Sequence, residues 1–525
     1  MIFAGAALWA FAPLAASLVF VSRHGRVFTG VNSGDLFDQF QYLAWIRDSG
    51  SHLLASNLWV IGRTPHDYVQ PMYLISGLLW RLGASIQLSY LIWKPVAVVV
   101  LFLGTGAYVR NLLGERRGQV VAVLVLALFY QSPVYALANW TGHLSAAHRL
   151  SLILASDDAN PALQLWGIDH TAIAIGLMPI FLIAVEKLLA GSAPEDRRAV
   201  WRWTAVAAIS GLLDSWLYPW LGVTLLAIVG GLLVCRGPRR RFLVLASAVA
   251  ATVLPLIYGV VLSRSDASWR AFQALLNLTG TAPWWALIAS FGPLVALAAL
   301  GLRRPRSDRE WMLTLWPVVC AAVYFLVPQF PPHALAGVTI PLAILAVRGW
   351  ARMSTWLRLR RARRACLGAA AAVAAILAVT APAAEINATG VRDELGPSLA
   401  GAYAQALFSL TSEQAHALAY LDRAPRSGGV LAPWLLSLSV PAFTGREVFA
   451  GHGNWQPAAN IALTTSFFNP GLRDPSGALR RAILTRTGAR FVVADCNAPA
   501  ALAWAIAPIA GPVRRFGCVT VYETR

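Results

Sequence analysis

Long apolar runs separated by short polar or basic segments dominate the first 380 residues of the chain. A transmembrane helix requires about 20 mostly apolar residues. The run 198–235 is too long for one span and contains Asp214 and Pro219, so we expect two spans that meet around Asp214. The pattern predicts about eleven transmembrane helices. The runs cover residues 2–21, 90–110, 118–138, 170–190, 198–235, 242–263, 283–302, 311–328, 334–350 and 366–382.

The chain after residue 384 has a different texture, with glycines, prolines and charges between short apolar stretches. We expect residues 1–384 to form the transmembrane module and residues 385–525 a small α/β domain. Ser412 is a candidate N-cap for the first helix of that domain. The strand-like and helix-like stretches are Val430–Ala432, Phe491–Ala494, Val519–Tyr522, Ser412–Arg423 and Ser476–Thr487.

Composition agrees with a membrane protein. Of the 525 residues, 57% are hydrophobic and 13% are charged, and the mean hydropathy is +0.59. Soluble domains carry about 25% charged residues, so an ordinary soluble enzyme, a disordered protein and a disulfide scaffold are excluded. The fold class predicted from the sequence is a polytopic α-helical membrane protein with a small C-terminal α/β extracytoplasmic domain.

The basic residues sort by loop. The five loops 110–117, 186–202, 235–241, 302–310 and 348–364 carry 22 lysines and arginines, whereas the loops between them carry three. Cytoplasmic loops are enriched in Lys and Arg, so we expect a multi-pass protein of the inner (plasma) membrane with a cytoplasmic N-terminus and an extracytoplasmic C-terminal domain. The net charge of +19 is then a topology signal, and no nucleic-acid partner is implied.

Successive loops must alternate between the two sides of the membrane, and the basic loops fit this alternation only if the short apolar stretch 71–82 does not cross. We therefore expect it to be an interfacial helix within a first outer loop, residues 22–89. Counting it as a span would invert every later loop. Arg23, His24 and Arg26 follow the first span and favour the opposite orientation, but the five later loops outweigh them. Cys496 and Cys518 are the two cysteines of the polar C-terminal part, and they could pair if that part is extracytoplasmic.

The first outer loop also carries the sharpest chemical pattern, in residues 34–48. On a helix Asp35 and Asp38 are three residues apart and share a face, which Tyr42 extends. Two such carboxylates suit a general base together with a clamp for a metal ion or a hydroxyl group. The alternative is a solvated helix start whose acidic residues are favoured by the helix dipole.

A second group of ionisable residues lies beyond the third span. The loop 139–169 is otherwise apolar, so its charges suggest a polar site at the membrane surface. Asp169 and His170 also open the fourth span, where a helix cap is the alternative interpretation. The spacing of the histidines is not that of a metal site. The residues are His143, His148, Arg149, Asp157, Asp158, Asp169 and His170.

Three further ionisable groups are candidates. Asp214 is either an intramembrane functional carboxylate or part of a tight outer turn. Lys94 and His333 either face an anionic head group or extend to the membrane surface and are solvated. Motifs for phosphate loops, dinucleotide binding, serine hydrolases and zinc proteases do not occur, so ATP-driven transport and zinc hydrolysis have no support.

The acidic pattern resembles that of the GT-C superfamily of polyprenyl-phosphate-sugar-dependent glycosyltransferases, which includes protein O-mannosyltransferases and aminoarabinose transferases. The family motif D-E-x-x-Y is matched by Asp38–Tyr42, with Gln39 in place of Glu. Gln70–Leu74 fits the start of the surface helix of the family, and Arg110–Arg117 fits its basic turn. The resemblance covers about the first 190 residues.

The last 100 residues are similar to the outer domain of bacterial glycosyltransferase-like membrane proteins. The stretches that carry this similarity are Val440–Arg446, Gly451-His452 and Gly488–Val493.

The resemblance implies transfer of a sugar, with inversion, from a polyprenyl-phosphate donor to a glycan, lipid or protein acceptor of the cell envelope. Asp38 would be the general base, and Asp35 would orient the acceptor hydroxyl or hold a metal ion. No cofactor is certain, and a divalent cation (Mg²⁺ or Mn²⁺) is the candidate. The C-terminal domain would help to select the acceptor. Membrane lipid is a further partner, and the substrate-binding candidates are Tyr42, Lys94, His143, Arg149, Asp169, His170 and His333.

Two other functions compete with this one. A transporter or flippase of lipid-linked saccharides would use Asp214 and the first-loop carboxylates as pathway residues. Transporters place such charges in broken spans near mid-membrane, often in two related halves, whereas these carboxylates collect in predicted outer loops and no second half repeats the first. A catalytically inactive relative that serves as a scaffold in envelope synthesis is the third hypothesis.

Overall fold

The computed structural model describes most of the chain. The described residues are 2–62, 64–132, 145–190, 197–237, 240–356, 390–469 and 474–525, with isolated positions 134, 141, 371, 372, 374, 376, 380 and 471. Contacts divide the chain into two compact units. Unit 1 comprises residues 1–11, 93–261 and 276–390, and unit 2 comprises residues 12–92, 262–275 and 391–525. Each unit is described by itself.

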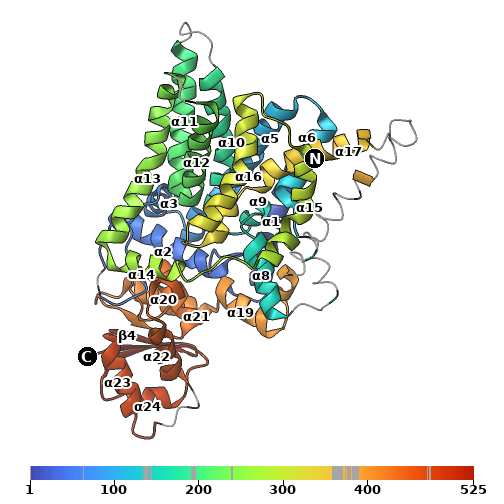
Figure 1. Cartoon of the computed structure of the whole chain (residues 1–525). Helices are drawn as coiled ribbons and strands as arrows, with labels where there is room; N and C mark the ends of the chain where they lie inside the picture. The colour runs from blue at the N-terminus through green and yellow to red at the C-terminus, as the bar shows by residue number, and fades with distance from the viewer. Residues whose placement is uncertain are drawn as a thin grey trace. The chain divides into compact units, whose positions relative to one another are not determined.

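Unit 1 is helical (Figure 1). Helix α1 (Ile2–Arg23) begins in it, and α13 (Ala246–Ser265) lies in it up to residue 261. Short 3₁₀ turns, η1 (Arg240–Leu245) and η2 (Pro331–Leu335), join some of the helices. The remaining helices are α5 (Trp93–Leu113), α6 (Arg117–Phe129), α8 (Ala146–Ser156), α9 (Pro161–Gln164), α10 (Asp169–Ala190), α11 (Arg197–Leu217), α12 (Pro219–Arg236), α15 (Trp284–Gly301), α16 (Asp308–Leu326) and α17 (Thr339–Trp356).

In the described part of the chain, six helices are long and apolar enough to cross a membrane: Ile2–Arg23, Ile86–Leu113, Asp169–Ala190, Pro219–Arg236, Phe242–Ser265 and Trp284–Gly301. The helices α6, α11, α16 and α17 coincide with four further apolar runs. The run 366–382 lies largely outside the described residues. The chain is a polytopic helical membrane protein, as its apolar runs predict.

The long run 198–235 is divided as expected, and the break falls at Tyr218. Asp214 lies in the last turn of α11, and α12 begins at Pro219. Proline suits the first position of a helix because it has no N–H group to leave unbonded and its φ is already helical. Tyr218 precedes it with an extended backbone, φ −150° and ψ 92°.

Glycines allow two pairs of helices in unit 1 to pack backbone against backbone. A Cβ atom added at Gly104 of α5 would lie 1.9 Å from the carbonyl oxygen of Gly176 in α10. A Cβ atom at Gly349 of α17 would lie 1.9 Å from the carbonyl oxygen of Leu297 in α15. Small residues drive the association of membrane helices by allowing this close approach.

Unit 2 combines the predicted first outer loop with the chain after residue 391. Strand β1 (Val27–Phe28) pairs antiparallel with β2 (Ser409–Leu410), so Phe28 lies opposite Ser409. The helices are α2 (Leu36–His52), α3 (Pro71–Arg81), α4 (Ile86–Leu91), α14 (Ala267–Leu276), α19 (Leu399–Phe408), α20 (Ser412–Arg423), α21 (Trp434–Thr444), η3 (Gly453–Trp455), α22 (Ala458–Phe468), α23 (Ala478–Thr487) and α24 (Ala501–Ile506).

The C-terminal part of unit 2 holds a four-stranded sheet with the order β3-β4-β6-β5. Strand β4 of this sheet is labelled in Figure 1. Strand β3 (Val430–Leu431) is parallel to β4 (Phe491–Ala494), whereas β5 (Ala510–Phe516) and β6 (Val519–Thr524) are antiparallel to their neighbours. The strands β3, β4 and β6 lie where the sequence predicts them. The edge strand β5 was not predicted, because its Pro and two Arg residues break the apolar pattern.

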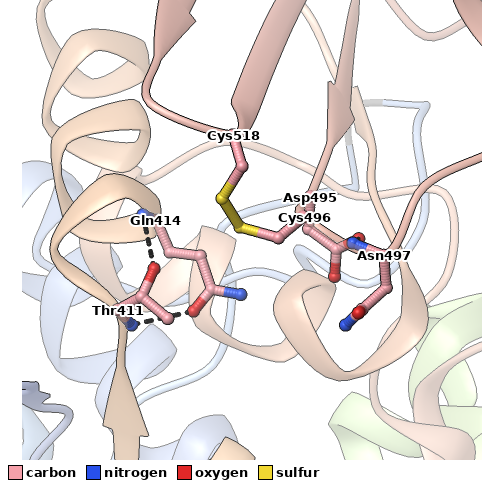
Figure 2. Close-up of a disulfide and its surroundings, with 6 residues drawn as sticks. All are labelled: Thr411, Gln414, Asp495, Cys496, Asn497 and Cys518. Carbon is pink, nitrogen blue, oxygen red and sulfur yellow. Dashed lines mark hydrogen bonds between the residues drawn. A yellow bond between two sulfur atoms is a disulfide. The ribbon is translucent and has the colours of Figure 1, made fainter. Parts of the chain in front are cut away.

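Two details of this domain differ from, or complete, the sequence prediction. Helix α20 covers Ser412–Arg423 as predicted, but its N-cap is Thr411, so the assignment of Ser412 as the cap is wrong. The Thr411 side chain accepts from the backbone of Gln414, whose side chain accepts from the Thr411 backbone (Figure 2). Cys496 and Cys518 form a disulfide with their Cα atoms 4.9 Å apart (Figure 2).

Candidate functional site

The predicted acidic motif begins at a turn of left-handed backbone. Gly34 has φ +90° and Asp35 has φ +32°, after which the chain enters α2 at Leu36. Asp35 occupies the N-cap position, but its side chain makes no capping hydrogen bond. The left-handed region is unusual for a residue with a side chain, and such backbone is concentrated at functional sites. Asp35 is exposed at the helix start, so the alternative of a solvated helix start favoured by the dipole stays open beside the functional interpretation.

Gln39 holds this turn in place. Its Nε2 donates to the carbonyl oxygen of Asn32 (2.6 Å) and to that of Gly34, while its Oε1 accepts from the backbone N–H of Asn32 (3.0 Å). The side chain is fully buried. A glutamate has no N–H group to offer to these two carbonyls. Gln39, the departure from the family motif, thus has a structural role that glutamate cannot fill.

Asp38 is paired with a histidine that lies 414 positions further along the chain. The Nε2 of His452 lies 3.0 Å from the Oδ1 of Asp38. The side chain of His452 is 3% exposed and that of Asp38 is 43% exposed. Because His452 Nδ1 accepts from the backbone N–H of Asn454 (3.3 Å), the neutral ring carries its proton on Nε2 and donates it to Asp38.

Asp35 and Asp38 line one cavity of about 330 Å³ in unit 2. Glu394 and Tyr403 come from the distant segment around α19, which the pairing of β1 with β2 attaches to the loop before α2. The hydroxyl of Thr29 strengthens this attachment by donating to the carbonyl of Leu407 (2.9 Å). The cavity is lined by Gly34, Asp35, Leu36, Phe37, Asp38, Glu394, Tyr403 and Leu407.

Glu394 adds a third carboxylate to this cavity. Ser33 Oγ donates to its Oε2 at 2.7 Å. Burial raises the pKa of Glu394, and the hydrogen bond from Ser33 opposes that rise. Beside the carboxylates, the Phe37 ring lies 5.4 Å from the Trp434 ring and 5.9 Å from the Tyr403 ring, between centroids. Acidic groups and aromatic rings thus meet at one place.

Tyr42 lies on the same helix but in the packed interior of unit 2. Its ring stacks on that of Tyr73 at 5.4 Å, with the ring of Tyr90 at 6.3 Å. Burial raises the pKa of Tyr42 well above its ordinary value, and the negative charge of Asp38 raises it further. The effect of Asp38 agrees with the shared helix face that the spacing predicts, and the substrate-binding role of Tyr42 stays a prediction.

In unit 1, Lys94 and Asp169 form a buried pair. The Nζ of Lys94 lies 3.7 Å from the Oδ1 of Asp169 and donates to the carbonyl oxygen of Leu165 at 2.5 Å. Both side chains are 1% exposed or less. The two residues begin α5 and α10, whose backbones meet at Gly104 and Gly176. The pair therefore also ties two helices together.

The other candidates of unit 1 are spread over several elements. His333 Nδ1 lies 3.0 Å from the Oδ2 of Asp158. Arg149 is exposed on α8, and His170 is buried in α10. Asp214 is fully buried, and in the described part of the chain neither of its oxygens has a hydrogen-bond partner. His143 lies outside the described residues.

Sequence reasoning did not select His452, Glu394 and Tyr403 as site residues. His452 lies in a stretch that carries the resemblance to outer domains of membrane glycosyltransferases, so a signal for it was present. Glu394 and Tyr403 have no motif. The pairing of β1 with β2 and the hydrogen bond from Ser33 to Glu394 bring their segment to the first loop.

The apolar helices, together with the unit that combines residues 12–92 with a C-terminal α/β part, define a polytopic membrane protein with a GT-C-like fold. The arabinofuranosyltransferase AftD from Mycobacteria is similar in structure, with a TM-score of 0.53 and 14% identity, over 98% of this chain and 41% of that chain. At this identity the likeness concerns the fold. This chain spans less than half the length of AftD.

Two further structures align over most of the chain with lower scores. ArnT from Cupriavidus metallidurans, bound to undecaprenyl phosphate, aligns over 98% of this chain and 97% of that chain, with 14% identity and a TM-score of 0.47. The oligosaccharyltransferase of Archaeoglobus fulgidus, tethered to an acceptor peptide, aligns over 93% and 69%, with 15% identity and a TM-score of 0.42. No protein-family model and no curated protein sequence matches the chain.

Proposed function

We propose that the chain is a membrane glycosyltransferase that transfers a sugar from a polyprenyl-phosphate donor to an acceptor outside the cytoplasm. The observation that carries this proposal is the half-exposed Asp38, held by the buried His452 in a cavity that also contains Asp35 and Glu394. The GT-C-like fold supports it, since AftD, the structure of that fold most similar in shape among those described above, is named a glycosyltransferase.

In this mechanism Asp38 is the general base. The acceptor hydroxyl oxygen attacks the anomeric carbon while the bond from that carbon to the phosphate oxygen breaks. The hydroxyl proton passes to Asp38, and the polyprenyl phosphate leaves with the bonding electrons, so the configuration inverts. His452 holds Oδ1 of Asp38 through one hydrogen bond, which leaves Oδ2 to accept the proton. A positioned base of this kind contributes about 10² to 10⁴ in rate.

Asp35 and the aromatic rings have positioning roles in this proposal. The Asp35 carboxylate would accept a hydrogen bond from a second sugar or acceptor hydroxyl, because it lines the same cavity. Phe37 and Tyr403 would contact the apolar face of a sugar ring. Glu394, whose pKa burial raises, would donate a hydrogen bond when protonated and accept one when ionised.

The leaving phosphate needs a positive partner, because its charge develops as the bond breaks. The candidates for this cation from the sequence are Lys94, Arg149, His170 and His333, and this role stays a prediction. Lys94 and His170 are buried, and Lys94 is paired with Asp169. A divalent ion is the other proposed source of charge, with Asp35 as its proposed carboxylate ligand, since Mg²⁺ and Mn²⁺ prefer oxygen ligands. In the described part of the chain the three carboxylates of this cavity do not meet as one group of metal ligands. Such an ion would neutralise the phosphate.

The proposed orientation, with unit 2 outside the cytoplasm, has support from the Cys496–Cys518 disulfide. Structural disulfides persist in oxidising compartments and are rare in the cytosol. Charge in the predicted loops supports the same orientation.

The competing hypothesis of a transporter or flippase makes a different chemical prediction. We expect membranes that contain the chain to convert a radiolabelled polyprenyl-phosphate sugar into free polyprenyl phosphate and a labelled acceptor. The chain is supplied to membranes of cells from which its own gene has been deleted. The natural acceptors in those membranes have then not yet received the sugar. Movement of the intact donor across the bilayer, with no cleavage of its sugar–phosphate bond, would contradict the enzyme and support the transporter.

A further inference from the structure

A second cluster of ionisable groups lies at the opposite end of α2 from Asp38. Asp48 is in the last turns of α2, and its side chain is 2% exposed. The Nδ1 of His52 lies 2.8 Å from Asp48 Oδ1, and the Nδ1 of His66 lies 3.2 Å from Asp48 Oδ2. One ligand atom of each of these residues lies within 4.8 Å of the other two.

Local structure explains how the three side chains meet. Asp48 and His52 are four residues apart on α2, so they lie one above the other on one face. His66 arrives from the loop after α2, which folds back through two backbone hydrogen bonds between Ala55 and Tyr68, of 2.7 Å and 3.0 Å. The rings of His52 and His66 lie side by side, with their centroids 4.0 Å apart.

Ser56 holds the carboxylate of Asp48 in place independently of the two histidines. Its Oδ2 accepts from the backbone N–H of Ser56 (2.7 Å) and from the Ser56 hydroxyl (2.8 Å). Ligands of metal sites are oriented in this way by hydrogen bonds from neighbouring groups. The two histidines are more open, with side chains 52% and 38% exposed, so an ion and a water molecule can reach them.

We propose that Asp48, His52 and His66 bind one Zn²⁺ ion. Two imidazole nitrogens and one carboxylate oxygen form a ligand set of the kind zinc takes, with a fourth position left for water. Tetrahedral ligands at 2.0–2.1 Å from zinc stand about 3.3 Å apart. The distances from the two Asp48 oxygens to His52 (2.8 Å) and His66 (3.2 Å) are somewhat shorter than that, so the histidines would move slightly apart from Asp48 on binding. Hard ions such as Mg²⁺ and Ca²⁺ prefer oxygen ligands and fit this set less well.

The ion would fasten the end of α2 to the loop that leads into α3. Asp48 is ten residues beyond Asp38, which is about 15 Å along a helix at 1.5 Å per residue, so the zinc site and the proposed active site are separate. Its role is to fix the far end of the helix that carries the proposed base. This inference does not depend on the proposed function.

The test uses the purified full-length chain without a histidine tag, stripped of metal by a chelator and returned to lipid nanodiscs. We expect one equivalent of Zn²⁺ by mass spectrometry, and Co²⁺ added in its place should give the visible absorption of a tetrahedral site. His66→Gln and His52→Gln should each lower the zinc affinity at least about 10-fold. Zinc should also raise the melting temperature of the wild-type chain and leave that of the variants unchanged.

Two controls separate the outcomes. His416→Gln changes an exposed histidine of α20 and should bind zinc as the wild type does. Asp38→Asn should also keep full zinc binding, whether or not the chain proves to be a glycosyltransferase. A wild-type chain that binds no zinc, or histidine variants that bind it with undiminished affinity, would overturn the proposal. Because His52 and His66 are exposed, their variants should fold, which their melting temperature in chelator verifies.

Discussion

Gln39 shows how one residue can have a role opposite to the one its motif suggests. The family motif places an acid here, but in this chain the side chain donates to two backbone carbonyls and accepts from one backbone N–H. A buried group needs all of its hydrogen-bond partners, so an amide is required and a carboxylate is not tolerated. The acidic chemistry of the loop therefore rests on Asp35 and Asp38.

Gln39→Glu tests this interpretation. It removes two donated hydrogen bonds and buries a charge, so we expect a loss of stability of about 2 to 4 kcal/mol. The measurement is the thermal melting of the purified chain, with sugar transfer recorded beside it. If the variant is as stable as the wild type and transfers sugar faster, Gln39 instead occupies the place of a functional acid.

His452 gives a second test at the residue scale, because it acts through Asp38. Hydrogen bonds to charged groups contribute about 1.5–3 kcal/mol, so His452→Phe should slow transfer by about 10-fold to 100-fold. His452→Gln keeps an N–H donor and should recover part of the rate. Equal rates for the two variants, at equal thermal stability, would mean that the hydrogen bond to Asp38 has no positioning role.

The raised pKa of Glu394 should make the free energy of unfolding depend on pH. Its pKa is raised by burial, so the folded chain holds the proton at pH values where the unfolded chain, with a pKa of about 4.3, has released it. Stability is therefore lost as the pH rises from the unfolded pKa through the folded one. We expect Glu394→Gln to melt at a higher temperature than the wild type at pH 7.5, with a smaller gain at pH 4.5.

Glu413 is the control for that measurement. Hydrogen bonds from its own backbone and from Thr411 lower its pKa, so Glu413→Gln should have the opposite sign. The account of Glu394 fails if its gain is the same at both pH values.

The residues that sequence reasoning found are those whose neighbours are close in the chain. Asp35 and Asp38 were selected by a helical spacing of three residues. Asp35 instead precedes α2 in left-handed backbone, although both residues line one cavity. Glu394 and His452 are hundreds of positions away. Strand pairing brings Glu394 to the cavity, and His452 reaches Asp38 from a distant loop, so no local pattern encodes either contact. For a site assembled from distant segments, a single sequence therefore predicts the residues that are close together in the chain and misses their distant partners.

At the scale of elements, apolar length was a dependable guide. Each predicted span that the structure describes contains a helix, and Pro219 explains the division of the longest run. The span 118–138 is the least well matched, because α6 ends at Phe129. Strand β5 was missed because its side chains are mostly exposed and do not alternate. The sequence also did not predict which helices pack against each other, because a glycine within an apolar run does not identify the helix that it will contact.

Gly104→Ala tests the close packing of α5 on α10. The added Cβ would meet a backbone carbonyl at 1.9 Å, which no side-chain rotation can relieve. Overpacking of this kind costs about 1–3 kcal/mol, so we expect a lower melting temperature in detergent. Gly106→Ala lies on the same helix with no atom within 4 Å of its added Cβ and should leave stability unchanged. Equal effects of the two substitutions would contradict the packing described.

At the scale of the whole molecule, each unit has its own chemistry. Unit 1 holds apolar helices, as a membrane module requires, and also the buried Lys94–Asp169 pair. Unit 2 holds the carboxylate cavity, the zinc cluster that we propose and the disulfide. Composition and charge predicted the class of protein and an orientation in the membrane. They did not predict that the first loop and the C-terminal segment pack as one unit.

The most direct test of the proposed function compares Asp38→Asn with Asp393→Asn, which changes an exposed acid one residue before Glu394. Sugar transfer from a polyprenyl-phosphate donor is measured for both variants and the wild type, at matched protein levels and melting temperatures. We predict a loss of at least about 100-fold for Asp38→Asn, because no base then takes the acceptor proton, and wild-type activity for Asp393→Asn. Full activity in folded Asp38→Asn would contradict the account.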